Sequence, residues 1–222
     1  MDVFFEKYYF WLSYATSISI ILPLVAGLYF RRKAKNTNGV FRSVFLYIFF
    51  IALVEASGWL SVLFETGSNV WISHVYVPIE GLLLASIYYM HIRDKKIRWG
   101  IIISVFVFLL FCLVDSLFLT GVKHMNGYSR VAESSLLIGL AILYLYTLYK
   151  DLNYVYLGRD PMFVLSCGVM IFFAGTAMAY EMFDAALAES ANTARICLCI
   201  VYVLSIAFNV VLVEVQRKAL RV

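Results

Sequence analysis

Seven long apolar stretches dominate this sequence and restrict what it can fold into. Each is about 20 residues long with few or no charges, the length that an α-helix needs to cross the hydrocarbon core of a bilayer. A transmembrane β-barrel would instead need strands that alternate apolar and polar residues, whereas "IIISVFVFLLFCLV" is apolar on every face. We predict spans over Phe10–Phe30, Ser43–Phe64, Trp71–Ile92, Gly100–Leu119, Arg130–Tyr149, Met162–Phe183 and Ala194–Val215.

The composition agrees with a membrane protein. Of 222 residues, 63% are hydrophobic and 14% are charged, whereas an average soluble domain has about 45–50% apolar and about 25% charged residues. The connections between the stretches are too short to hold a soluble domain. We therefore expect an all-α membrane protein in which residues 1–222 form a single seven-helix transmembrane domain.

The basic residues predict how the bundle is oriented. Most of the 18 lysines and arginines follow the first, third and fifth stretches or lie in the C-terminal tail. By the positive-inside rule, the N-terminus is outside and the C-terminus is cytoplasmic. The formal net charge of +4 thus reflects membrane topology, and we expect no nucleic-acid partner. The start, "MDVFFEKYYFW", is too acidic and aromatic for a cleavable signal peptide, so we interpret the first stretch as a mature span.

Metal and retinal sites are not indicated by the sequence. The four cysteines lie inside predicted spans, where a thiol behaves as a small apolar residue, and the three histidines lie in separate segments without ligand spacing. A retinal protein needs a lysine within the last helix, and "ARICLCIVYVLSIAFNVVLVEV" contains none. We expect no metal and no cofactor.

Two glutamates lie deep inside predicted spans. An ionisable group in hydrocarbon costs about 2.5–3.5 kcal/mol even on the insertion scale, so such groups normally face the bundle interior. Glu55 and Glu80 are each about nine residues, or roughly 13 Å, from the outer ends of their helices. We expect them to share one site.

Other polar and aromatic residues cluster in the same outer half, which favours a cavity open to the outside. The alternative is that the acids near the rim, and Arg130 with them, are wetted helix ends, and that Glu55 and Glu80 make structural hydrogen bonds. The predicted ligand-binding residues are Glu55, Trp59, Tyr76, Glu80, Glu133, Tyr180, Glu181 and Asn209.

The motifs "VYVPIEGLLL", "RVAESSLLIGLAILYLY" and "AFNVVL" occur in this order along the chain. In this respect the sequence resembles a group of seven-helix bacterial inner-membrane proteins, some of which are attached to sensor kinases. The resemblance implies a multi-pass protein of the bacterial inner membrane with a sensory or small-ligand role. Its matched polar positions are Glu80, Glu133 and Asn209.

A second resemblance rests on "EASGW" followed by "VPIEG". This pair is similar to the integral-membrane lycopene cyclases, whose Pro-x-Glu-Glu motif protonates a polyene. Here Gly81 occupies the place of the second acid, and the second half of the chain has no matching motif. If the protein is an enzyme of this kind, Glu55 and Glu80 are the candidate catalytic acids.

From these observations we expect a sensory, ligand-binding membrane module rather than an enzyme. A small or lipophilic ligand would bind in the outer half and shift the bundle between two helix arrangements, which a cytoplasmic or membrane signalling partner would detect. A lipid- or isoprenoid-modifying enzyme and a small-molecule transporter remain the alternatives.

Overall fold

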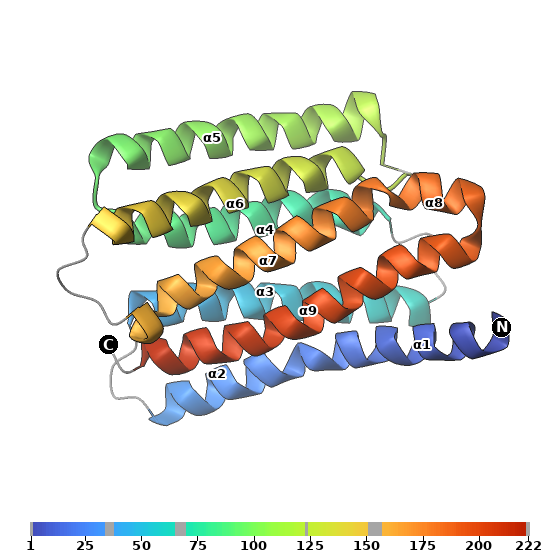
Figure 1. Cartoon of the computed structure of the whole chain (residues 1–222), viewed down its shortest axis with the longest axis horizontal. Coiled ribbons are helices and arrows are strands. Elements are labelled where there is room, and N and C mark those ends of the chain that lie inside the picture. Colours follow the sequence, from blue (N-terminus) through green and yellow to red (C-terminus); the bar gives the residue numbers. More distant parts are fainter. Residues whose placement is uncertain (1, 34–37, 65–69, 123, 151–156, 221–222) are drawn as a thin grey trace.

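The chain forms a bundle of long α-helices that run roughly side by side (Figure 1). The computed structural model describes residues 2–33, 38–64, 70–122, 124–150 and 157–220. All regular elements within these ranges are helical, and none is a strand. The predicted all-α class is therefore confirmed.

The helices follow the predicted stretches closely. The first stretch consists of two helices, the fourth ends in a turn of π-helix, and the sixth is followed by a short extra helix. In chain order the elements are α1 (Asp2–Ser19), α2 (Ile21–Lys33), α3 (Gly39–Leu63), α4 (Trp71–His91), α5 (Lys95–Val114), η1 (Asp115–Leu119), α6 (Gly127–Lys150), η2 (Leu157–Arg159), α7 (Pro161–Glu181), α8 (Phe183–Glu189) and α9 (Ala191–Ala219).

Six helical stretches in the described ranges are long and apolar enough to cross a membrane, which makes this a multi-pass membrane protein. They are α1 with α2, α3, α5 with η1, α6, α7 with α8, and α9. The helix α4 is not among them, because His74, Pro78 and Glu80 lower its hydropathy. It packs against α3, α5 and α6, where a helix can carry polar groups without exposing them to lipid.

A break at Ile20 separates α1 from α2 and was not predicted. Pro23 has no N–H to donate to the carbonyl oxygen of Ser19, and its ring crowds that carbonyl. The Ser19 hydroxyl donates to the carbonyl oxygen of Thr16 at 2.6 Å and accepts from Asn209 Nδ2 at 2.7 Å. Next to the break, α1 is therefore hydrogen-bonded to α9.

Side-chain caps fix where three of the helices begin. The Asp94 carboxylate accepts from the Lys96 N–H at 2.7 Å before α5, and Asp160 accepts from the Met162 N–H at 2.9 Å before α7. Before α9, the Ser190 hydroxyl accepts from the Thr193 N–H at 3.0 Å. Each side chain satisfies a backbone donor that the first turn of the helix leaves free.

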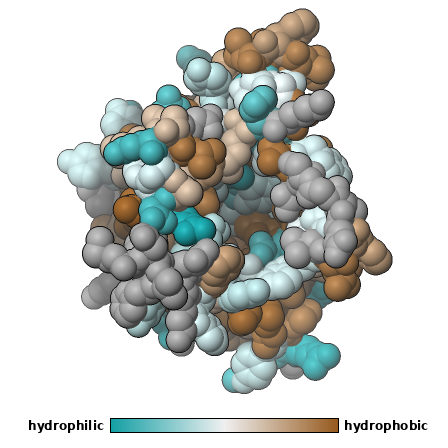
Figure 2. Space-filling model, turned by 90° about the vertical axis from the view of Figure 1, so that its right-hand side faces the viewer, coloured by the Kyte–Doolittle hydropathy of each residue, from teal (hydrophilic) through white to brown (hydrophobic). Residues whose placement is uncertain are grey.

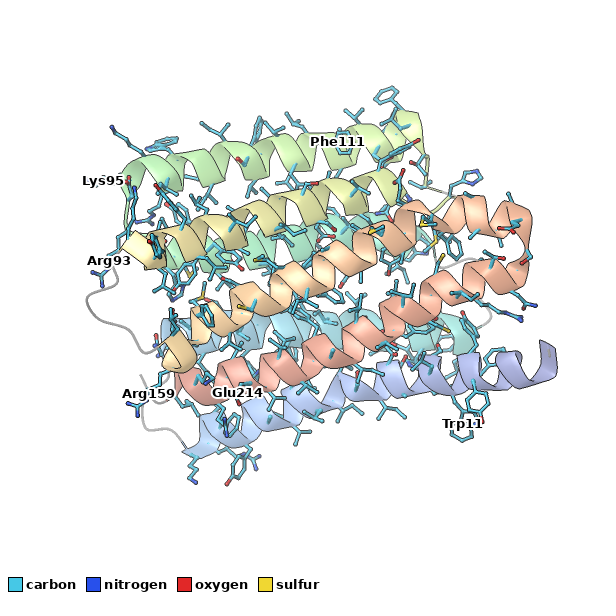
Figure 3. All side chains as sticks on the ribbon, viewed as in Figure 1. Trp11, Arg93, Lys95, Phe111, Arg159 and Glu214 are labelled. Atoms are coloured by element: carbon cyan, nitrogen blue, oxygen red, sulfur yellow. The ribbon has the colours of Figure 1, made fainter. Side chains whose placement is uncertain are left out.

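Basic side chains gather at one end of the bundle. Arg93, Lys95 and Arg159 all lie at the left-hand end in Figure 3, where the chain also terminates. The last turn of α2 adds Arg31, Arg32 and Lys33, while the tail adds Arg217 and Lys218. Lys35 and Arg221 lie outside the described residues. We refer to this end as the basic end.

The best-packed part of the core lies toward the basic end. Val44, Leu84, Leu165 and Leu212 are fully buried there, and all belong to one hydrophobic cluster. In the same region the Tyr88 hydroxyl donates to Ser166 Oγ at 3.3 Å. This layer closes the basic half of the bundle.

Glycines bring α7 close to α9. A Cβ atom added at Gly168 would lie 2.6 Å from Val211 Cγ1, and one at Gly175 would overlap Leu204 Cδ1. Gly168 and Gly175 are seven residues apart, as are Leu204 and Val211, so two turns of each helix share this close contact. Small residues commonly allow such close helix contacts in membranes.

We expect Gly168→Leu to destabilise the bundle by about 1–3 kcal/mol, the usual cost of overpacking a filled interface. The matched control is Gly139→Leu in α6, where no atom of the described residues lies within 4 Å of an added Cβ. Equilibrium unfolding in mixed detergent micelles measures both. Equal stability of the two variants would show that α7 and α9 can separate without loss.

Candidate ligand-binding cavity

A cavity of about 390 Å³ lies in the half of the bundle away from the basic end. Residues of α1, α3, α4, α6, α7 and α9 line it, so most of the bundle contributes to its walls. Figure 2 looks onto the end that carries the N-terminus and α8, and shows a hollow near the centre of this face. The cavity reaches this end, because its lining includes Val70 and Met125, which lie in the connections before α4 and α6. Its volume falls within the range of about 300–1,000 Å³ typical of small-molecule sites.

One stripe of α3 faces the cavity. It consists of Tyr47, Ile51, Val54, Glu55 and Gly58, which recur at the three- and four-residue spacing of a helix face. The Glu55 carboxylate is partly exposed to the cavity. Within the described part of the chain it makes no hydrogen bond and no ion pair, so it is available to a ligand.

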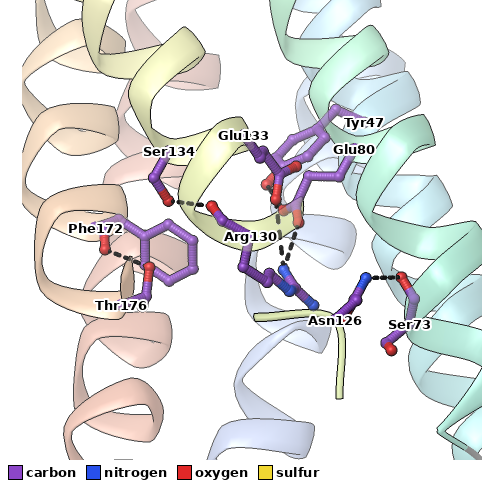
Figure 4. Close-up of polar contacts among 9 residues, drawn as sticks. All are labelled: Tyr47, Ser73, Glu80, Asn126, Arg130, Glu133, Ser134, Phe172 and Thr176. Atoms are coloured by element: carbon purple, nitrogen blue, oxygen red, sulfur yellow. Dashed lines mark hydrogen bonds and ion pairs between the residues drawn. The ribbon is translucent and has the colours of Figure 1, made fainter. Parts of the chain in front are cut away.

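Arg130 and Glu80 form an ion pair at the cavity wall. Arg130 Nη1 lies 3.2 Å from Glu80 Oε2, and the Tyr47 hydroxyl donates to Glu80 Oε1 at 2.9 Å. The Glu80 side chain is 1% exposed and that of Arg130 is 16% exposed. Figure 4 shows Arg130 extending from α6 toward the Glu80 carboxylate. Glu80 thus accepts from both sides.

A second carboxylate, Glu133, shares the same guanidinium nitrogen. Glu133 Oε2 lies 3.7 Å from Arg130 Nη1, one helical turn further along α6. Its side chain is completely buried, and neither carboxylate oxygen has a hydrogen-bond partner among the described residues. Two buried carboxylates therefore depend on one cation.

Two tyrosine rings enclose the Arg130 guanidinium. Its central carbon lies 4.8 Å from the ring centroid of Tyr76 and 5.0 Å from that of Tyr180. Both distances allow a cation–π attraction. Because Tyr76 belongs to α4 and Tyr180 to α7, the arginine ties three helices together.

The start of α6 is fixed by buried polar contacts, and these position Arg130. Asn126 Nδ2 donates to the Ser73 carbonyl oxygen at 3.1 Å. The fully buried Asp115 carboxylate accepts from Ser129 N at 3.1 Å, and from Ser129 Oγ and Thr120 Oγ1 at 2.5 Å each. Asp115 is therefore a structural cap and not a wetted helix end.

The structure brings five of the predicted site residues together around the cavity. Glu55 and Glu80 were expected to share one site, and both contribute to its walls. The five are Glu55, Tyr76, Glu80, Tyr180 and Asn209.

Three predicted residues do not line the cavity. Glu133 lies behind Arg130 instead. Trp59 is 46% exposed and stacks on Tyr14 of α1 at 5.5 Å, because it stands just past the edge of the α3 stripe. Glu181 is exposed on the outside, since it is rotated by about 100° from Tyr180 on the same helix.

Sequence reasoning missed the central role of Arg130, which it treated as one of the rim residues. The spacing of Arg130 and Glu133 in "RVAE" could have indicated that both side chains share one face of α6. The α3 periodicity could likewise have placed Tyr47 beside Glu55. Other lining residues that were not predicted are Phe172, Thr176, Tyr202, Ser205 and Phe208.

No group of three or more metal-ligating side chains is found among the described residues. Lys218 lies at the basic end of α9 and donates to the Gly158 carbonyl oxygen. This lysine is therefore far along the helix from Ser205 and Asn209, which line the cavity.

Comparisons of this chain with protein-family models, with curated proteins and with solved structures find no match. Both family resemblances therefore stay predictions.

Proposed function

We propose that this protein is a seven-span receptor-like module of the bacterial inner membrane that binds a small molecule in the cavity. The observation that carries the proposal is the Glu55 carboxylate on the cavity wall, which has no partner among the residues that the structure describes. A structural network would satisfy its polar groups internally, as Asp115 and Glu80 do. Glu55 instead faces open space, as expected for a side chain that binds a ligand.

The proposed orientation has the cavity open to the outside. Basic side chains gather at the opposite end of the bundle (Figure 3), and the positive-inside rule assigns that end to the cytoplasm. In this proposal α4 is the seventh span, enclosed by α3, α5 and α6. The N-terminus is then outside and the C-terminus is cytoplasmic.

Signalling would use the Arg130 contacts. The guanidinium joins α4, α6 and α7 in one cluster. A ligand that binds one arrangement of these helices better than another shifts the population toward it. The basic ends of α2 and α9 would present the change to a cytoplasmic or membrane partner.

The other two functions considered from the sequence fit the site less well. A cyclase-like general acid needs a proton to donate, whereas Glu80 accepts from Tyr47 and pairs with Arg130. A transporter needs a path to the second side, where Leu84, Leu165 and Leu212 pack without exposure. Ligand binding without turnover or passage agrees best with these contacts.

Native mass spectrometry with solvent extraction of the purified protein tests the proposal. Ser205→Trp would fill the cavity, and Ser104→Trp places the same side chain on an exposed face of α5. We expect a bound small molecule in wild type and in Ser104→Trp, and its loss from a folded Ser205→Trp protein. A molecule retained equally by both variants, or none in the wild type, would contradict ligand binding in this cavity.

A further inference from the structure

The charges around the cavity are unequal. Of the described residues that line it, Glu55 and Glu80 are acidic and Arg130 is the one basic residue. Glu133 adds a third carboxyl group directly behind Arg130, at 3.7 Å. If all are ionised, the acids outnumber the cation.

The Arg130 charge is already compensated. Its Nη1 lies 3.2 Å from Glu80 and 3.7 Å from Glu133, and both carboxylates are almost completely buried. An anionic ligand at Arg130 would have to approach these two carboxylates. A negative charge there would be repelled more strongly than it would be in water, because the interior screens charges poorly.

Glu55, by contrast, has no cation beside it among the described residues. Its carboxylate lies on the cavity wall and has no hydrogen-bond or ion-pair partner in the part of the chain that the structure describes. A positively charged group that entered the cavity would supply the missing partner.

Aromatic rings form much of the remaining wall. Phe172 and Phe208 stack with their centroids 4.7 Å apart, and Tyr47 packs edge-on to Phe208 at 6.5 Å. Tyr202 lines the cavity as well. Aromatic faces attract ammonium groups, above all quaternary ones, and also bury the apolar part of such a ligand. The wall already binds one cation in this way, since Tyr76 and Tyr180 enclose Arg130.

From these contacts we propose that the cavity binds an organic cation, an amine or quaternary ammonium compound with an apolar portion, whose charge pairs with Glu55. The inference rests on the proposed ligand-binding function and names its ligand class. The cationic group would lie beside Glu55, and the apolar portion would lie against Phe172 and Phe208.

A charge-matched set of probes tests this ligand class. Benzyltrimethylammonium, benzyl alcohol and phenylacetate are titrated by calorimetry into the full-length protein in phosphatidylcholine nanodiscs. We expect benzyltrimethylammonium to bind at least about tenfold more tightly than the other two, a difference of about 1.4 kcal/mol. Tighter binding of phenylacetate, or no binding of any probe, would overturn the proposal.

Two isosteric variants show whether Glu55 is responsible. Glu55→Gln should weaken benzyltrimethylammonium binding by about tenfold without changing the melting temperature, because Glu55 has no partner to lose among the described residues. Glu181→Gln, on the exposed surface of α7, should leave the affinity unchanged. Equal affinities of wild type and Glu55→Gln would overturn the assignment. The Ser205→Trp experiment does not depend on ligand charge, so it separates failure of this inference from failure of the proposed function.

Discussion

Arg130→Met should lower the free energy of unfolding by about 3–5 kcal/mol, the usual effect of removing one partner from a buried ion pair. The loss would leave Glu80 and Glu133, 1% and 0% exposed, without the nitrogen that both now contact. The contacts to the Tyr76 and Tyr180 rings would be lost as well. Equilibrium unfolding in mixed detergent micelles measures the change.

The control for this prediction is an ion pair at the surface. Arg217 pairs with Glu214 at 2.7 Å, but its side chain is 50% exposed. Arg217→Met should therefore cost less than about 1 kcal/mol. The contrast between the two arginines isolates the effect of burial.

A compensated variant distinguishes charge from packing. In Arg130→Met combined with Glu80→Gln and Glu133→Gln, the buried charges are removed together, and much of the lost stability should return. A triple variant no more stable than Arg130→Met alone would mean that the arginine stabilises the bundle through its packing on the tyrosine rings. The ion-pair account would then be wrong.

The helical architecture could be predicted because the bilayer imposes a length and a hydropathy on each span. The third helix was expected at Trp71–Ile92 and is observed at Trp71–His91. The first was expected at Phe10–Phe30, but its break at Ile20 was missed although Pro23 indicates it. Local chemistry thus identifies the helices well, but a proline alone does not identify a break, because Pro78 lies inside α4 without one.

The depth of the site along the helices could be predicted from the sequence, but the direction in which each side chain points could not. Counting residues from the helix ends placed Glu55 and Glu80 at one level, and both line the cavity. The same counting treated Arg130 as a rim residue, because it cannot show how a helix is rotated toward its neighbours. The rotation of α7 also explains why Tyr180 lines the cavity and Glu181 does not.

Chemical access to the cavity should differ sharply from access to the packed half of the bundle. Ser205 lines the cavity, whereas Ser166 is 0% exposed and accepts from Tyr88. Serine-to-cysteine changes are nearly isosteric, so each reports the access of its own position. All four native cysteines lie in the helices and are unpaired, so they are first replaced by alanine.

Labelling of these two cysteines from outside the cell is the measurement that most directly tests the proposal that the cavity opens to the outside. A membrane-impermeant methanethiosulfonate should modify Ser205→Cys at least about 100-fold faster than Ser166→Cys, a ratio that corresponds to an opening free energy of about 3 kcal/mol. Bound benzyltrimethylammonium should slow the reaction of Ser205→Cys. Equal rates at both positions, or modification of Ser205→Cys only from the cytoplasmic side, would contradict the account.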